Sequence, residues 1–135
     1  METIKKIELN VGLNLHKRYY VQIVKDNEKY RIHGIVNAKK LIRELFSRTM
    51  HLKKNDSTVV EFATINNTPW ILRLEHKQRI LNMELYRVDP EDITNMSCRF
   101  TWHGQKEELM AAISDLSAQF IRLNKEEREV HNARA

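Results

Sequence analysis

Apolar and polar residues alternate strictly along residues 7–15 of the chain. The apolar positions are Ile7, Leu9, Val11, Leu13 and Leu15. A period of two is typical of a strand with one buried and one solvated face. Residues 19–25 and 29–35 are also rich in β-formers, and they flank Asp26 and Asn27. Because these two residue types tolerate the left-handed backbone of a tight turn, we predict a three-stranded antiparallel meander.

The pattern changes to a helical period after Asn37, a residue type that often caps helix N-termini. The apolar positions are Ala38, Leu41, Ile42, Leu45, Phe46 and Met50. They follow the i, i+3, i+4 rule and therefore share one face of a helix. The other face is charged and carries Lys39, Lys40, Arg43, Glu44 and Arg48. We predict an amphipathic helix that ends before the polar segment 53–56.

Alternation returns from Ser57 onward. We predict strands over residues 58–65, 70–77, 80–88 and 96–102, separated by turns at 66–67 and near Gln78 and by the polar run 89–92. After Gly104 the apolar residues are spaced by 4, 3, 4 and 3 positions, which is a helical pattern. They are Leu109, Ile113, Leu116, Phe120 and Leu123.

The predicted element order is βββ-α-ββββ-α, an α+β fold in one domain over residues 1–124. Short turns between consecutive strands favour antiparallel pairing, and the alternation predicts that both helices pack on one sheet face. Residues 125–135 lack the apolar stripe, so we expect a frayed or disordered tail. The predicted core comprises Leu9, Leu41, Leu45, Phe46, Phe62, Leu72, Leu74, Leu85, Phe100, Leu116 and Phe120.

Composition agrees with a single globular domain. The chain has 135 residues, 41% of them hydrophobic, with only 3 glycines and 2 prolines, which excludes collagen-like and low-complexity classes. No apolar run approaches the roughly 18 residues of a membrane span, and the N-terminus lacks a secretory signal pattern. We therefore expect a cytoplasmic protein. The single cysteine, Cys98, falls on the apolar side of its predicted strand, where a thiol acts as an inert small hydrophobe.

Catalytic and metal-binding motifs are not found in the sequence. There is no G-x-S-x-G elbow or glycine-rich phosphate loop, and the six histidines include no H-x-x-x-H pair. His76 and His103 lie near the ends of their predicted strands, and whether they form a site or are ordinary surface or core histidines stays open. We expect no catalysis, no cofactor and no bound metal.

The net charge of +5 is unevenly distributed. Residues 1–55 hold 13 Lys and Arg against 5 Asp and Glu, a net +8, whereas residues 56–135 hold 10 against 13, a net −3. Such polarity would steer an acidic partner, either a nucleic acid or an acidic protein. Lys17, Arg18, Tyr19 and Tyr20 add the mixture of cations and rings used for phosphates and bases. No known nucleic-acid-binding motif accompanies them, and a solvated helix face is the preferred explanation of the helical cations.

The solvated sheet face supplies a second candidate contact surface. Opposite charges on neighbouring strands form cross-strand pairs, either as an ordinary wet face or as a platform for a protein partner. The candidate partner-binding residues are Lys39, Lys40 and Arg43 on the helix and Arg73, Glu75, Glu84, Tyr86 and Arg99 on the sheet.

Three segments together carry a resemblance to a known group of proteins. They are the helix NAKKLIRELF, the meander STVVEFATINNTPWILRLEHKQRILNMELYRV and the closing strand and helix CRFTWHGQKEELMAAISDLSAQFIRL. This organisation resembles small cytoplasmic immunity proteins of bacterial polymorphic and contact-dependent toxin systems. The resemblance lies in architecture, assigns no role to any residue, and implies a non-enzymatic inhibitor that binds and blocks a cognate toxin. The alternative is a nucleic-acid-binding accessory or regulatory protein that uses the basic half.

Self-association is expected from two features of the sequence. Met110, Ile121 and Val130 lie off the main stripe of the second helix and are free to face another copy. The first strand, if it lies at a sheet edge, offers backbone groups to a second chain. Because two-fold pairs are the commonest assemblies of soluble proteins, we predict a homodimer.

Overall fold

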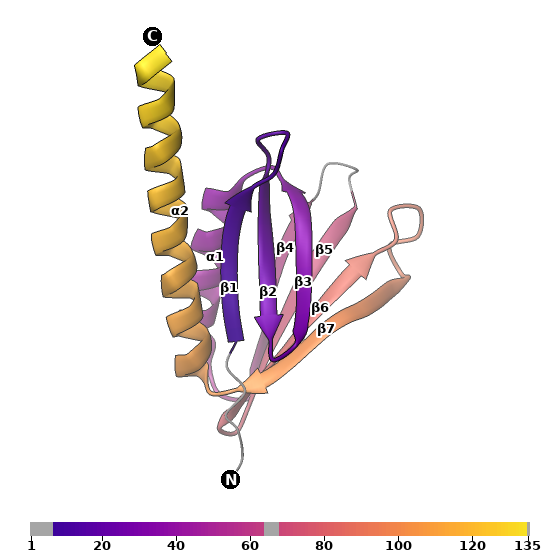
Figure 1. Cartoon of the computed structure of the whole chain (residues 1–135). Coiled ribbons are helices and arrows are strands. Elements are labelled where there is room, and N and C mark those ends of the chain that lie inside the picture. Colours follow the sequence, from indigo (N-terminus) through magenta and orange to yellow (C-terminus); the bar gives the residue numbers. More distant parts are fainter. Residues whose placement is uncertain (1–6, 64–67, 135) are drawn as a thin grey trace.

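The chain folds into two antiparallel sheets and two helices (Figure 1). In a computed structural model, which describes residues 7–63 and 68–134, sheet A contains β1 (Ile7–Leu13), β2 (Tyr19–Lys25) and β3 (Glu28–Ile35). Sheet B contains β4 (Asp56–Ala63), β5 (Pro69–Lys77), β6 (Ile80–Val88) and β7 (Met96–Gly104). The helices are α1 (Ala38–Met50) and α2 (Lys106–Arg134). The predicted α+β class, element order and antiparallel pairing are confirmed.

The turns between strands follow the residue types that the sequence supplies. Asp26 and Gln78 adopt positive φ angles of 54° and 55° in the β2–β3 and β5–β6 turns. The first strand is shorter than predicted and ends at Leu13, so Leu15 lies outside it and is fully exposed. The reason is local: the side chain of Asn14 accepts hydrogen bonds from the backbone N–H groups of His16 and Arg18, which turns the chain.

The two sheets share one hydrophobic core with the helices. Tyr30 of β3 meets Trp70 of β5 edge to face, with ring centroids 5.4 Å apart, and the Lys25 ammonium at the end of β2 donates to the Thr101 carbonyl of β7 at 2.7 Å. On the other side of the molecule, α2 lies along β1, and α1 lies between α2 and β4 (Figure 1). The helices therefore pack against both sheets, α2 against sheet A and α1 against sheet B, whereas the alternation predicted that both cover one face of a single sheet.

Most of the predicted core is confirmed by burial. The buried members are Leu9, Leu41, Leu45, Leu72, Leu74, Leu85, Phe100 and Leu116. Phe120 is half-buried and packs on Tyr19, with ring centroids 5.6 Å apart. The prediction for Phe46 is wrong, because this side chain sits on the flank of α1 that faces α2 and is 42% exposed. Phe62 lies outside the residues whose side chains the structure describes.

The helix ends are held by side chains. Asn37 caps α1 as predicted, and its Oδ1 accepts from the backbone N–H of Lys40 at 3.0 Å. Lys106, in the first turn of α2, donates from Nζ to the carbonyls of Met50 (2.9 Å) and Leu52 (3.1 Å) at the end of α1. The C-terminal end of α1 thus meets the N-terminal end of α2, and the two helices run antiparallel.

The second helix continues past the end of its apolar stripe. The loss of the apolar stripe predicts a frayed or disordered tail over residues 125–135, whereas α2 runs to Arg134. Lysine, glutamate, arginine and alanine, which dominate this segment, are good helix formers and favour continuation of the helix after the apolar stripe ends. In Figure 1 the last turns of α2 project beyond both sheets. Neither described helix has the length and apolarity that crossing a membrane requires.

Candidate partner-binding surfaces

An apolar groove of about 600 Å³ runs between α1 and α2. Its floor is formed by Ile42 and Phe46 of α1 and by Phe120 and Ile121 of α2. Phe46 and Ile121 are 42% and 64% exposed, so large apolar side chains from both helices are open to solvent in one place. Exposed apolar surface gathered in one patch with a polar rim marks an interaction site more often than scattered apolar residues do.

The rim of this groove is basic. Lys39 and Arg43 are four residues apart, so they lie on the same side of α1, and Lys125 approaches from α2. Ser117 and Asn124 supply the remaining polar lining, and no carboxylate is among the lining residues that the structure describes. Two of the three predicted helical cations therefore flank an apolar groove, a feature that the single-helix pattern could not reveal.

Lys40 does not belong to this groove. It lines a separate hollow that lies between α1 and β4, together with Glu44, Arg48, Val59 and Glu61. There Arg48 donates from Nη1 to the Thr58 hydroxyl at 3.1 Å, and its Nε lies 3.9 Å from Oε2 of Glu44. One residue along a helix corresponds to a rotation of about 100°, which separates Lys40 from its neighbour Lys39. The structure thus divides the predicted charged face between two surfaces.

The outer face of sheet B holds a connected network of charged side chains. Arg73 on β5 donates to Glu84 on β6 at 3.0 Å and also to Glu75 on its own strand. Lys77 approaches the other oxygen of Glu75 at 3.1 Å. The Tyr86 hydroxyl donates to the second oxygen of Glu84 at 2.7 Å. Four predicted residues, Arg73, Glu75, Glu84 and Tyr86, are therefore brought together.

These contacts shift the pKa values of Arg73, Glu75 and Tyr86 in the directions that keep the two ions charged and the phenol protonated. The hydrogen bond to Glu75, followed by that to Glu84, raises the pKa of Arg73 against the opposing effect of burial. Hydrogen bonds from Lys77 and Arg73 lower the pKa of Glu75. The hydrogen bond to the Glu84 carboxylate, with burial second, raises the pKa of Tyr86 to about 12. At neutral pH the Tyr86 hydroxyl is therefore protonated.

A β-bulge in β7 changes the position of Cys98. Phe100 pairs with Leu85, but the next β6 residue, Tyr86, pairs with Cys98, so Arg99 has no partner across the strand pair. The extra residue moves Cys98 out of phase with Phe100. The prediction that Cys98 is a buried thiol is wrong, because it is exposed. Arg99 is also exposed, and it lines a shallow hollow between β7 and the β2–β3 turn.

The outer face of sheet A carries a smaller aromatic and basic cluster. The Tyr20 ring stands 5.6 Å from the His33 ring, and the Arg31 guanidinium lies 4.4 Å above Tyr20. Gln22 accepts two hydrogen bonds from Arg31, at 2.8 and 3.1 Å. Tyr19, which the sequence grouped with Tyr20, points to the opposite face and packs against α2. Only one of the two adjacent tyrosines therefore belongs to this surface.

The two histidines singled out in the sequence do not come together. His76 pairs with Leu81 across the β5–β6 ladder and is half-buried on the side of Leu74. His103 pairs with Asn82, one position out of phase, and is exposed. Because successive residues of a strand point to opposite faces, the side chains of His76 and His103 lie on different faces of sheet B. Among the described residues, no group of three or more His, Cys, Asp or Glu side chains is arranged to hold a metal ion.

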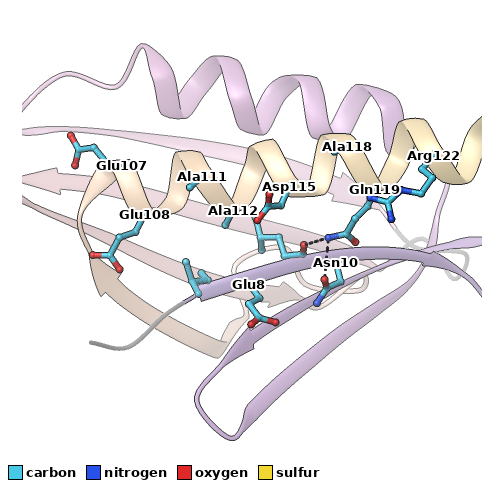
Figure 2. Close-up of a pocket in the computed structure, with 12 residues that line it drawn as sticks. Glu8, Asn10, Glu107, Glu108, Ala111, Ala112, Asp115, Ala118, Gln119 and Arg122 are labelled. Atoms are coloured by element: carbon cyan, nitrogen blue, oxygen red, sulfur yellow. Dashed lines mark hydrogen bonds between the residues drawn. The ribbon is translucent and has the colours of Figure 1, made fainter. Parts of the chain in front are cut away.

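A cleft of about 670 Å³ separates β1 from α2 and is shown in Figure 2. Gln119 reaches from α2 across this cleft and donates from Nε2 to the Leu9 carbonyl and to the Asn10 side chain, both at 3.1 Å. The charged side chains that line the cleft are the cation Arg122 and the acids Glu8, Glu107, Glu108 and Asp115. The polar atoms at the centre of the cleft are thus used to attach α2 to sheet A.

Comparisons with known proteins found no match to a protein-family model, to a curated protein or to a solved structure.

Proposed function

We propose that this chain is a non-enzymatic cytoplasmic binding protein that neutralises a protein partner, most concretely an immunity protein that blocks a cognate toxin. The observation that carries the proposal is the groove between α1 and α2. There, Phe46 and Ile121 remain exposed, whereas Leu41, Ile42 and Leu45 of α1 are buried. A small domain that leaves aromatic and aliphatic side chains open within a groove has an anchoring surface for a partner.

The charged network on sheet B supports the same function. Arg73 is held by Glu75 and Glu84 before any partner arrives, so binding orders fewer side chains. A rigid pattern of alternating charge favours specificity more than affinity, which suits an inhibitor that must recognise one target. The separation of His76 and His103 removes the acid–base pair that the sequence left open.

Co-expression tests this function. The probe is the protein encoded immediately upstream of this chain, produced in cells with and without it. We expect the upstream protein to arrest growth alone and the wild-type chain to restore growth. The double variant Phe46→Glu/Ile121→Glu should fail to restore growth, while Ile93→Glu, which changes a 75% exposed apolar side chain outside the groove, should behave as wild type. Growth arrest that the wild-type chain does not relieve would contradict the proposal.

A second candidate function is nucleic-acid binding through the outer face of sheet A. The observation in its favour is the cluster of Tyr20, Arg31 and His33, close in sequence to Lys17 and Arg18. Phosphate neutralisation by several cations makes affinity fall steeply with salt. Micromolar or tighter binding of generic DNA or RNA at physiological salt, lost in Arg31→Ala, would favour this function over the inhibitor.

A further inference from the structure

We infer that the groove between α1 and α2 binds an acidic amphipathic helix of a partner protein. This inference rests on the proposed function and specifies the chemistry of the segment that would enter the groove. Its three supports are the apolar floor of the groove, the sign of the charge on its rim and the antiparallel arrangement of the two helices that form it.

The dimensions of the groove suit a helix. Its lining spans positions 39–46 of α1 and 117–125 of α2, which at 1.5 Å per residue correspond to about 10 and 12 Å. That length accommodates about two turns of a helix laid between the pair. Helix-in-groove recognition uses apolar anchors spaced i, i+3 or i+4, and i+7, and the floor residues Phe46 and Ile121 would receive them. Because α2 continues to Arg134 beyond the groove, a longer partner helix could lie alongside α2 for further turns.

The charge of the rim selects the partner. Lys39, Arg43 and Lys125 flank the floor, and the described lining contains no carboxylate to neutralise them. The first turn of α1, which begins at the same end of the groove as Lys39, carries no acidic residue. The partial positive charge of that helix N-terminus therefore adds to the potential of the cations. Glutamate and aspartate on both sides of an apolar stripe complement this rim.

A second copy of the chain fits this groove poorly. In a two-fold dimer the same patch occurs on both subunits, so each basic rim would face the other basic rim. Like charges brought together at an interface disfavour association. An acidic helix is attracted to the groove, because it covers the same apolar side chains and pairs each cation of the rim with a carboxylate.

The test uses two synthetic amphipathic peptides of about 16 residues, or about four turns. Both carry leucines at the same i, i+3, i+4, i+7 positions, and the flanking positions are glutamate in one peptide and lysine in the other. Fluorescence anisotropy with the full chain should show at least about tenfold tighter binding of the glutamate peptide. Amide chemical-shift changes should concentrate on α1 and on residues 117–125 of α2.

Charge reversal provides the matched comparison. The double variant Lys39→Glu/Arg43→Glu should weaken the glutamate peptide by about tenfold or more and strengthen the lysine peptide. Lys53→Glu reverses an exposed charge beyond the C-terminal end of α1 and outside the groove, so it should leave both affinities within about twofold. All three positions are exposed, so the variants should keep the fold, and circular dichroism checks this.

Three results would overturn the inference: equal binding of both peptides, shift changes on sheet B instead of the helices, or a dimer that Ile121→Glu dissociates. If the peptides fail while the chain still neutralises the upstream protein, the inference falls and the proposed function stands. If the glutamate peptide binds in the groove but the upstream protein is not neutralised, the groove chemistry stands and the inhibitor function falls.

Discussion

Gln119 in α2 completes the hydrogen bonding of Val11 at the free edge of β1. The Val11 N–H donates to Gln119 Oε1 at 3.0 Å, while the amide nitrogen of the same side chain donates to the carbonyl of Leu9 at 3.1 Å. One primary amide thus presents an acceptor and a donor to the strand, as the backbone of a neighbouring strand would. Gln119 therefore partly occupies the β1 edge, one of the two features that predicted self-association. Ile121, which belongs to the other feature, lies in the groove whose basic rim disfavours a second copy. The homodimer stays a prediction.

Replacing Gln119 by leucine should destabilise the protein by about 1–3 kcal/mol, because Val11 and Leu9 would lose half-buried partners at the strand edge. Urea denaturation measures the change in the free energy of unfolding. Ala118→Leu, at the exposed neighbouring position of α2, is the control and should stay within about 0.5 kcal/mol. Equal stability of both variants would show that the amide does not support the edge.

Tyr86 should ionise with a pKa raised to about 12, because its hydroxyl donates to the Glu84 carboxylate. Since the folded-state pKa is raised, the stabilising effect is fully present below pH 10 and is lost as the pH rises through about 12. Phenolate absorbance measures the titration. Glu84→Gln should lower the midpoint, and Glu61→Gln, on the neighbouring strand β4, should not. An unchanged midpoint in Glu84→Gln would contradict the assignment.

Cys98 should react with a thiol reagent in the native state at a rate near that of an unfolded chain, because the bulge at Arg99 places it on the surface. Ellman's reagent, added with and without denaturant, measures both rates. Cys98→Ser should change the free energy of unfolding by no more than about 0.5 kcal/mol. Protection of the thiol under native conditions would instead support the buried position that the alternation predicts.

Lys106 should hold the two helices together at their junction. Replacing it by methionine keeps the aliphatic stem but leaves the carbonyls of Met50 and Leu52 without the charged donor, so we expect a loss of about 1.5–3 kcal/mol. Thermal unfolding measures the difference. Lys53→Met removes a neighbouring exposed charge and should have little effect. If both variants have the same melting temperature, the contact contributes nothing to stability.

Sequence periodicity predicted the elements of this fold well but not the relations between them. The alternation in Leu72, Leu74 and Leu85 reports burial directly, and these residues are buried. A bulge adds one residue without any sequence mark, so alternation placed Cys98 on the wrong face. The apolar pattern of α1 includes Phe46 but cannot say that α2 leaves part of that face uncovered.

The same distinction applies to the candidate surfaces. Arg73 and Glu84 were predicted to share a face because strand parity places them together, and their ion pair needs only the neighbouring register of β5 and β6. The groove requires positions 39–46 and 117–125 to meet, and no local pattern encodes a contact over that separation. Lys125 was consequently absent from the predicted set, although its charge was visible in the sequence.

The contact between Val11 and Gln119 also has a consequence for synthesis of the chain. The two residues are 108 positions apart, and ribosomes add about 5–20 residues per second. Val11 is therefore made about 5–20 seconds before the side chain that covers the β1 edge, and β2 and β3 also precede that side chain. During that interval a nascent chain on the same messenger meets its neighbours with an uncovered strand, flanked by Lys5, Lys6, Lys17 and Arg18. Like charge next to an uncovered strand disfavours its pairing with another chain, so Lys17 and Arg18 should limit such pairing until α2 is made.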